Sequence, residues 1–335
     1  MKKIRTAVIG CGAVSKNHGK ALVSSEYAHL EYAVDCDFQK AVEFAATYGG
    51  QPLSDYKELF RKDDVDVVHI ATPHNTHPRI AMDCLNAGLH VFCEKPLAIL
   101  PHDAKLMIAC AQENGRRLGV CFQNRMNESV IEAKKILDEG VFGSIISGMV
   151  VVTWERSGTY YSESPWRGRY ETEGGGVLIN QSIHSLDLLN YLSGGIHSIT
   201  GVAAKLRDDD AYEVEDTAMF HGSFVNGGTF VGFCTNCYPK SKQCLVELHL
   251  EHATLVITQH SLSITHDQKT IVHAFDKASG YKSEWGLSHG VLIDEFYRSL
   301  KENRPFICDG SSGLAAIKVV QAIQHSNGQM MRIME

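Results

Sequence analysis

Short apolar runs alternate with helix-type periodicity through residues 1–122 of this 335-residue chain. The runs expected to form strands are 4–9, 30–34, 65–71, 90–93 and 118–122, and the helical patterns between them fall at 15–25, 38–48, 78–87 and 101–114. Regular alternation of strand and helix predicts a parallel sheet with helices on both faces. The first part of the chain is therefore expected to be a doubly wound α/β domain.

The pattern changes after Gln123, where this alternation stops. Helices are expected at 129–138, at about 177–192, and near the end of the chain at 292–303 and 313–326. Segments rich in β-forming residues lie at 145–154, 198–206, 218–225, 229–235, 244–250 and 254–258. They predict an antiparallel or mixed sheet. We therefore expect two domains, 1–123 and 124–335.

Composition and charge argue against several classes of function. The formal net charge is −7 without a basic run, which disfavours nucleic acid and anionic membranes as partners. No stretch of about 20 apolar residues is present, and the first apolar run ends at Gly10 without a cleavage-type segment, so neither a membrane span nor a secretion signal is expected. The ten cysteines fit a reducing cytoplasm. The CxxC at Cys234 and Cys237 lies in a β-rich region and is interpreted as coincidence, so no metal is expected.

A glycine-rich turn joins the first expected strand to the first expected helix. It reads Gly10-Cys11-Gly12-Ala13-Val14-Ser15, with Ser15 where the dinucleotide-binding pattern has a third glycine. Gly10 allows the tight turn, and Gly12 lets the backbone approach a pyrophosphate at the helix N-terminus. The alternative is that these glycines only close a turn between strand and helix.

Asp35 ends the second expected strand and completes this pattern. Its carboxylate would accept hydrogen bonds from the adenine ribose and repel a 2′-phosphate, and no arginine follows closely, so NAD is favoured over NADP. Asp37 is a competitor for the ribose, although it is equally suited to the first turn of the next helix. We rank Asp35 first because it directly follows the apolar run.

Polar residues also follow the third expected strand, in the turn Thr72-Pro73-His74-Asn75-Thr76-His77. The carboxyl ends of the strands line the ligand crevice in a doubly wound sheet, so this turn is expected beside the adenosine and ribose. The contacts are expected from Thr72, Pro73, Asn75 and His77. An ordinary turn and helix cap is the other interpretation. His74 and His77 lack an evident third ligand and do not indicate a metal site.

Lys95 lies in the segment Glu94-Lys95-Pro96, directly after the fourth expected strand. Pro96 disfavours helix and keeps Lys95 extended, and the strand end directs it toward the same crevice. Partial burial there would lower the pKa of the lysine toward a range useful for proton transfer. The residue types alone leave this interpretation nearly even with that of a solvated lysine paired with Glu94.

A second polar group follows the run Gly174-Gly175-Gly176. Asn180, His184 and Asp187 are spaced by four and three residues, so they share one face of a helix. His184 is suited to exchange a proton, with Asp187 as a partner that orients its other nitrogen. A buried histidine satisfied by local hydrogen bonds is the alternative, but three polar residues in register after a glycine run favour a site.

These motifs together resemble the Gfo/Idh/MocA oxidoreductase family. The resemblance covers nearly the whole chain and rests on Ala7 to Gly12, Val34-Asp35, Thr72-Pro73 with Asn75 and His77, Glu94-Lys95-Pro96, and Gly174 through His184 and Asp187. It implies an N-terminal Rossmann domain at 1–123 and a C-terminal α+β domain at 124–335 for substrate binding. The second domain would contain a large open, mainly antiparallel sheet that forms a homodimer or homotetramer. Lys95 and His184 would be the catalytic pair.

The resemblance implies further contacts around cofactor and substrate. Glu94, Lys95 and Gln123 would join the glycine loop around the cofactor, and substrate would be held by Lys95, Arg125, Trp166, Arg167, Asn180 and His184. Asn127 is a further candidate, and Tyr160 and Tyr161 are weaker ones. The alternatives are surface ion pairs for the arginines and simple packing for the tryptophan.

Asn180 is a departure, because many family members carry aspartate four residues before the histidine. An amide orients a hydroxyl group by hydrogen bonds but cannot exchange a proton near neutral pH. The proton chemistry would then fall to Lys95 or His184, with Asn180 orienting the substrate.

The expected function is that of an NAD-dependent dehydrogenase acting on CH–OH groups. Hydride would pass between nicotinamide and a secondary alcohol or ketone of a sugar, sugar derivative or cyclitol. Two alternatives use the same fold. One is an enzyme similar to trans-dihydrodiol dehydrogenase, and the other is a cofactor-sensing regulator that has lost catalysis.

Overall fold

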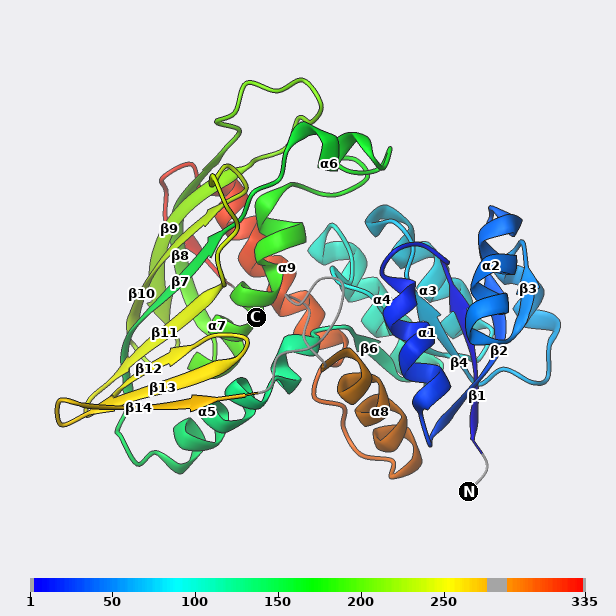
Figure 1. Ribbon diagram of the computed structural model, residues 1–335, viewed down its shortest axis with the longest axis horizontal. Coiled ribbons are helices and arrows are strands. Elements are labelled where there is room, and N and C mark those ends of the chain that lie inside the picture. The colour runs from blue at the N-terminus through cyan, green and yellow to red at the C-terminus, as the bar shows by residue number, and fades with distance from the viewer. Residues whose placement is uncertain (1–2, 276–287, 334–335) are drawn as a thin grey trace. The chain divides into compact units, whose positions relative to one another are not determined.

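The computed structural model describes residues 3–275 and 288–333 (Figure 1). The chain divides into two compact units. Unit 1 comprises Met1–Gln123 and Leu287–Leu314, and unit 2 comprises Asn124–Gly286 and Ala315–Glu335. The domains expected from the sequence were two continuous ranges, whereas a late segment of the chain here belongs to the first unit.

Unit 1 is built on a six-stranded parallel sheet in the order β3-β2-β1-β4-β5-β6. The strands are β1 (Ile4–Ile9), β2 (Ala28–Val34), β3 (Gln51–Leu53), β4 (Val67–Ile70), β5 (His90–Cys93) and β6 (Leu118–Val120). The direction of winding reverses between β1 and β4, and the loops at the carboxyl ends of the strands beside such a reversal are where these sheets bind ligands. The glycine turn, the turn at Thr72 and Lys95 all follow strands of this central group.

Helices cover both faces of this sheet. Strand β4 is buried along its whole length, which is typical of a strand that is covered on both sides. The helical segments are α1 (Ser15–Ser24), α2 (Phe38–Tyr48), η1 (Tyr56–Arg61), η2 (His74–Thr76), α3 (His77–Asn86), α4 (Pro101–Glu113) and α8 (Ser288–Lys301). Helix α8 comes from the late segment of the chain and packs against α1, the first helix (Figure 1). The core of unit 1 therefore includes residues from both ends of the sequence.

Unit 2 contains a nine-stranded mixed sheet in the order β14-β13-β12-β11-β7-β10-β9-β8-β15. The strands are β7 (Ile145–Thr153), β8 (Ile196–Ala204), β9 (Thr217–Phe224), β10 (Thr229–Thr235), β11 (Leu245–Leu250), β12 (Thr254–Ile257), β13 (Ser261–His266), β14 (Lys269–Ala274) and β15 (Met331–Arg332). Neighbouring strands are antiparallel except β7 and β10, which run parallel.

Helices α5 and α7 pack against strands of this sheet (Figure 1). The helical segments of this part of the chain are η3 (Gln123–Met126), α5 (Glu128–Glu139), α6 (Gly158–Ser162), η4 (Val177–Ser182), α7 (Ile183–Ser193) and α9 (Gly310–Ser326). On β9 and β10, the buried Phe220 and Phe230 adjoin the exposed Met219 and Val231. Successive side chains of a strand point to opposite faces, so one face of the sheet is core and the other is an exposed surface with apolar residues.

The fold class predicted from the sequence is confirmed. The differences are local and have physical causes. Strand β3 was not expected, because it has only three residues and contains Pro52, which is tolerated at the edge of a sheet. The helix expected at about 177–192 begins as a π-helix, η4, before it continues as α7. Such segments are frequent at functional sites.

Candidate functional site

The glycine turn has the geometry that dinucleotide binding requires. Gly10 has φ = +92°, and a Cβ atom there would lie 2.6 Å from the carbonyl oxygen of Ala71, so a side chain is excluded on two grounds. A Cβ atom at Gly12, by contrast, would meet no protein atom within 4 Å. The space beside Gly12 and the backbone N–H groups at the start of α1 fit a pyrophosphate.

Asp35 is bonded to the glycine turn. Its Oδ2 accepts a hydrogen bond from the backbone N–H of Cys11 at 2.8 Å, and its Oδ1 accepts one from the backbone N–H of Asp37 at 2.9 Å. These bonds hold the carboxylate at the end of β2 beside the turn, where a ribose would lie. Asp37 is the residue before α2 and not part of its first turn, and its side chain makes no capping hydrogen bond. Within the turn, Ala13 is exposed and Val14 is half-buried.

His77 connects the turn after β4 to the segment after β5. Its ring is fully buried, with Nδ1 2.8 Å from the carbonyl oxygen of Pro96 and Nε2 2.9 Å from that of Thr72. Burial lowers the pKa of His77, while the contacts with the carbonyl oxygens of Pro96 and Thr72 oppose this shift. These contacts suit His77 to position the two backbone segments that it touches. Asn75 is the exposed residue of this turn. The Lys95–Pro96 peptide bond is cis.

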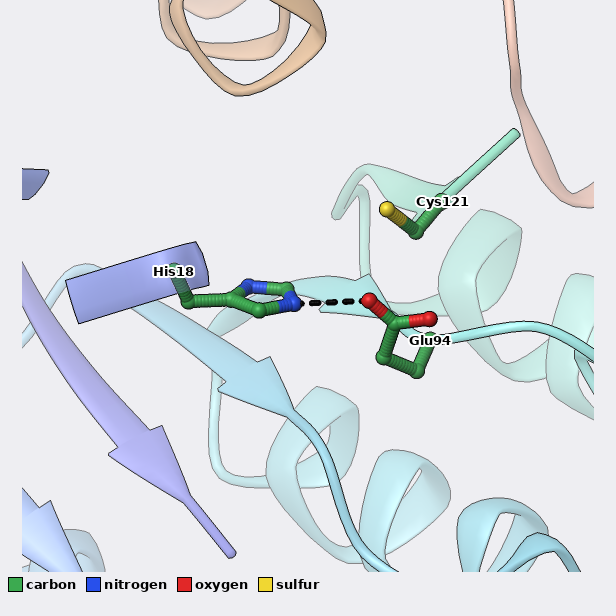
Figure 2. A group of neighbouring side chains, drawn as sticks. All are labelled: His18, Glu94 and Cys121. Carbon is green, nitrogen blue, oxygen red and sulfur yellow. Dashed lines mark hydrogen bonds and ion pairs between the residues drawn. The ribbon is translucent and has the colours of Figure 1, made fainter. Parts of the chain in front are cut away.

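Glu94, the residue before Lys95, is held inside unit 1 by a histidine from α1 (Figure 2). His18 Nε2 lies 2.8 Å from Glu94 Oε1, and the backbone N–H of Lys95 donates to Glu94 Oε2 at 3.2 Å. Burial alone would raise the pKa of Glu94. The hydrogen bond and charge of His18, together with the charges of His289 and Lys95, instead hold this pKa well below its usual range. Glu94 is therefore an ionised anchor on one side of Lys95, and His77 holds Pro96 on the other side.

Cys121 is the third member of the cluster in Figure 2. The donor atoms of His18, Glu94 and Cys121 lie within 4.8 Å of one another, a spacing that would suit a metal ion. Burial and the charge of Glu94 raise the pKa of the Cys121 thiol well above its ordinary value, and metals bind the thiolate. The direct bond between His18 and Glu94 also uses two of the three ligands. The cluster is thus better described as a buried ion pair beside a thiol.

A chain of hydrogen bonds extends from this ion pair into the core of unit 1. His18 Nδ1 lies 2.7 Å from His69 Nδ1, His69 Nε2 lies 2.7 Å from the hydroxyl of Tyr297, and that hydroxyl lies 2.7 Å from Thr6 Oγ1. Burial lowers the pKa of His69 well below its ordinary value. Every member has a partner, as buried polar groups require, so the chain fixes His18 in place.

In unit 2, Asn180 lies on the π-helix η4 and His184 in the first turn of α7. Both side chains are half-buried. The Asn180 amide nitrogen donates to Glu173 Oε1 at 2.5 Å and to the Tyr160 hydroxyl at 3.2 Å. The Tyr160 hydroxyl also accepts a hydrogen bond from Gln181 Nε2 at 3.0 Å. Asn180 therefore belongs to a network of a carboxyl group, two amides and a phenol.

Arg125 and Asp187 form a bidentate ion pair inside unit 2. Arg125 Nε donates to Asp187 Oδ2 at 2.9 Å, Nη2 donates to Oδ1 at 2.6 Å, and the guanidinium lies 4.4 Å from the ring centre of Tyr191. Both oxygens of Asp187 accept hydrogen bonds from Arg125, and its role beside His184 stays a prediction. Arg125 is buried, and its place in the structure is that of a tie between η3 and α7.

The remaining expected residues lie in two places. Arg167 donates from Nη1 to the carbonyl oxygen of Tyr160 at 3.1 Å and lies 4.3 Å from the centre of its ring. Trp166 is half-buried beside it, and its carbonyl oxygen accepts a hydrogen bond from Thr172. Gln123 is buried in unit 1, where Cys121 Sγ lies 3.8 Å from its Oε1. Arg167 and Trp166 thus adjoin the Asn180 network through Tyr160.

Sequence reasoning missed His18 and Glu173, which the structure places against two of the expected residues. His18 lies one turn into the helix after the glycine motif, and a polar residue on the buried face of that helix was an available signal. Glu173 directly precedes the glycine run, but its contact with Asn180 depends on the path of a loop that has no periodic pattern.

Two family models match the chain. The oxidoreductase family with an NAD-binding Rossmann fold, GFO_IDH_MocA, matches residues 4–122, and the GFO/IDH/MocA C-terminal domain matches residues 130–256. Among the described residues, no helix combines the length and apolar character needed to cross a membrane.

Relatives include named dehydrogenases. The chain is 32% identical over 200 residues to 1-carboxy-3-chloro-3,4-dihydroxycyclo hexa-1,5-diene dehydrogenase of Comamonas testosteroni, covering 57% of this chain and 48% of that protein. It is 28% identical over 251 residues to glucose-6-phosphate 3-dehydrogenase of Bacillus subtilis (strain 168), covering 73% and 70%. The WlbA dehydrogenase from Bordetella pertussis, solved with NADH and UDP-GlcNAcA, has a TM-score of 0.86 at 28% identity, covering 99% of both chains. The chain therefore belongs to the Gfo/Idh/MocA family of oxidoreductases with an NAD-binding Rossmann fold.

Proposed function

We propose that this protein transfers a hydride between NAD and a secondary alcohol or ketone of a sugar, sugar derivative or cyclitol. The observation that carries the proposal is the anchoring of Lys95. Its neighbour Glu94 is ionised and held by His18, and the carbonyl oxygen of Pro96 is held by His77. A half-buried lysine fixed at the carboxyl end of β5 fits a catalytic role better than the role of a solvated surface residue.

In the oxidation direction, the carbinol carbon gives its hydride to the nicotinamide ring and the hydroxyl group gives up its proton. NAD supplies the hydride acceptor. Lys95 and His184 hold the hydroxyl oxygen, and one of the two takes up its proton. Asn180 orients the substrate by hydrogen bonding. Reduction of a ketone uses the same groups in reverse. The amide of Asn180 exchanges no proton itself.

The test is turnover on a panel of sugars, nucleotide sugars and cyclitols, followed by nicotinamide absorbance. Lys95→Ala should abolish turnover while NAD affinity, measured by calorimetry, is retained. Lys105→Ala, which removes an exposed lysine on α4, is the matched control and should be fully active. Full activity of Lys95→Ala on the true substrate would refute the mechanism. Binding of NAD without hydride transfer on any alcohol would favour the cofactor-sensing regulator.

A second substrate class is favoured by one relative. The Comamonas testosteroni protein, which shares 32% identity with this chain, is named as the dehydrogenase of a dihydroxycyclohexadiene. Diol oxidation on such a ring, of the kind carried out by dihydrodiol dehydrogenases, is chemically the same transfer from a carbinol carbon. Turnover of aromatic dihydrodiols in preference to sugars would select this alternative.

We infer a preference for NAD over NADP from the position of Asp35. The backbone N–H groups of Cys11 and Asp37 fix its carboxylate at the end of β2, where a 2′-phosphate would be repelled. Asp35→Asn should reduce the ratio of kcat/KM for NAD to that for NADP. An unchanged ratio would show that another residue sets the preference.

We also propose that the protein assembles with copies of itself through the exposed face of the large sheet. Val202, Met219 and Val231 are each about half exposed on neighbouring strands of that face. Apolar surface of this kind is typical of an interface, and a second copy presents the same face. Met219→Lys should reduce the molar mass measured by light scattering to that of a smaller assembly. The cytoplasm is the proposed location, since all ten cysteines are free thiols.

A further inference from the structure

Glu173 is a buried carboxyl group in the loop before η4. Its side chain is fully buried, and the backbone N–H of Glu173 is bonded to the carbonyl oxygen of Arg169 at 2.8 Å. This turn brings Oε2 to within 2.5 Å of the backbone N–H of Gly168 and Oε1 to within 2.5 Å of Asn180 Nδ2. Each oxygen therefore accepts a hydrogen bond from a fixed donor.

The bond to Glu173 fixes the direction of the Asn180 amide. Nδ2 also donates to the Tyr160 hydroxyl, so both of its N–H bonds are directed to neighbours in unit 2. The opposite orientation would place Oδ1 against a carboxylate oxygen, which repels an acceptor. A carboxylate at Glu173 thus keeps Oδ1 of the amide directed away from Glu173.

Several charged groups surround this carboxyl. Burial raises the pKa of Glu173 to about 7, and the charge of Glu215 acts in the same direction. The hydrogen bonds from Gly168 and Asn180 and the charge of Arg167 oppose this rise. The phenols of Tyr160 and Tyr161 also lie near, and burial keeps both protonated by raising their pKa values. Both forms of Glu173 are consequently accessible near neutral pH.

We propose that Glu173 is the positioning residue for Asn180, and that the two residues together form one hydrogen-bonding site for a substrate hydroxyl group. This inference rests on the proposed function, because it assigns Asn180 the role of substrate acceptor. As a carboxylate, Glu173 holds the amide with Oδ1 toward the substrate. Once protonated, Glu173 becomes a donor, and the amide can turn and offer N–H instead.

The pair also explains why position 180 carries an amide. An aspartate there would place a second carboxylate within hydrogen-bond distance of Glu173 Oε1, and two such groups cannot both ionise readily. One of them would bind a proton, as in other carboxyl pairs that share a site. The pair therefore has its carboxyl group at position 173 and its amide at position 180. Exchanging the carboxyl and the amide together should be tolerated better than changing one of them alone.

The first measurement is independent of turnover. Infrared difference spectra recorded across neutral pH should contain the carbonyl band of one protonated carboxyl that E173Q lacks. In N180D a carboxyl band should persist to higher pH, because the two acids share a proton. N180D leaves Glu173 unaltered, so it still tests the pair if E173Q does not fold. A band that survives E173Q, or that N180D does not move, would overturn the proposal. E171Q, an exposed change in the same loop, is the control and should match the wild type.

The second measurement uses the substrate. Wild-type kcat/KM should fall as pH drops below about 7, because the carboxylate is the active form. E173Q and N180D should each lose on the order of 10- to 100-fold in kcat/KM, as expected from misplacing a substrate contact. In E173Q this acidic limb should disappear, and E173Q/N180D should recover activity relative to both single variants. Absence of recovery would contradict the pairing. If the wild type oxidises no alcohol, the proposed function fails, and the infrared result alone decides on the pair.

Discussion

His18 donates a hydrogen bond from Nε2 to Glu94 Oε1 across 2.8 Å, and both side chains are almost completely buried. The bond ties the first helix after the glycine motif to the end of β5. Because Lys95 is the next residue, the position of its backbone depends on a contact that neither motif reveals by itself. The glycine loop and the EKP segment are thus parts of one packed structure.

His18→Ala should lower the free energy of unfolding by about 3–5 kcal/mol, since it leaves the Glu94 carboxylate buried without its partner. His18→Gln keeps a donor near the same place and should cost less. Urea denaturation followed by circular dichroism measures both. His29→Ala, at an exposed histidine of β2, is the control and should change stability by less than about 0.5 kcal/mol. Equal losses for Ala and Gln at position 18 would show that packing, and not the ion pair, is responsible.

Two glycines of the same turn should respond in opposite ways to alanine. Gly10→Ala should destabilise the protein by on the order of 3 kcal/mol, because a positive φ and a contact with Ala71 both oppose a Cβ atom. Gly12→Ala should leave the melting temperature nearly unchanged but weaken NAD binding, since the added methyl group would occupy the space left for the pyrophosphate. Calorimetry of NAD binding and thermal denaturation separate the two effects. Unimpaired NAD binding by Gly12→Ala would place the pyrophosphate elsewhere.

Arg125→Met should destabilise the protein by about 3–5 kcal/mol, because Asp187 is then a buried acid without a counter-charge. Burial already raises the pKa of Asp187 against the opposing effect of Arg125, so removing Arg125 should make the loss grow with pH. The double variant Arg125→Met/Asp187→Leu should regain much of this stability. Urea denaturation of the wild type, Arg125→Met, Asp187→Leu and the double variant gives the coupling energy. A coupling near zero would mean that the pair is not formed in solution.

The stability of the protein should depend on Glu173 in a defined pH range. Folding raises its pKa from the ordinary value of 4.5 to about 7, so folding favours the protonated acid. This contribution is complete below about pH 4 and is lost as pH rises to about 7, with a slope of at most about 1.4 kcal/mol per pH unit. The stability of Glu173→Gln should therefore fall less steeply than that of the wild type over this range. Parallel curves from urea denaturation at several pH values would contradict the raised pKa.

The sequence was sufficient for the fold class, the enzyme class and the NAD cofactor, and the comparisons with known proteins confirm all three. These predictions depend on local patterns, such as the alternation that defines β1 to β6 and the glycines at 10 and 12. The substrate and the roles of single site residues stay predictions, because they depend on loops.

Contacts between segments that are distant in the chain could not be predicted from the sequence. Arg125 and Asp187 are 62 residues apart, and nothing in either segment indicates that they pair. The same holds for Glu173, whose contact with Asn180 depends on the turn at Gly168. Helical periodicity predicted that Asn180 and His184 share one face of a helix, but it could not foresee that the helix begins as a π-helix.

The hydroxyl groups of Thr6 and Tyr297 share a hydrogen bond although 291 residues separate them in the chain. During synthesis, β1 therefore leaves the ribosome long before the helix that completes its surroundings. The nucleotide-binding unit cannot reach its final packing until α8 has been made, which happens after most of unit 2. Most of unit 1 is therefore translated first but cannot complete its packing until α8 has been made. A chain truncated before α8 would expose to water the core histidines that are buried in the complete protein.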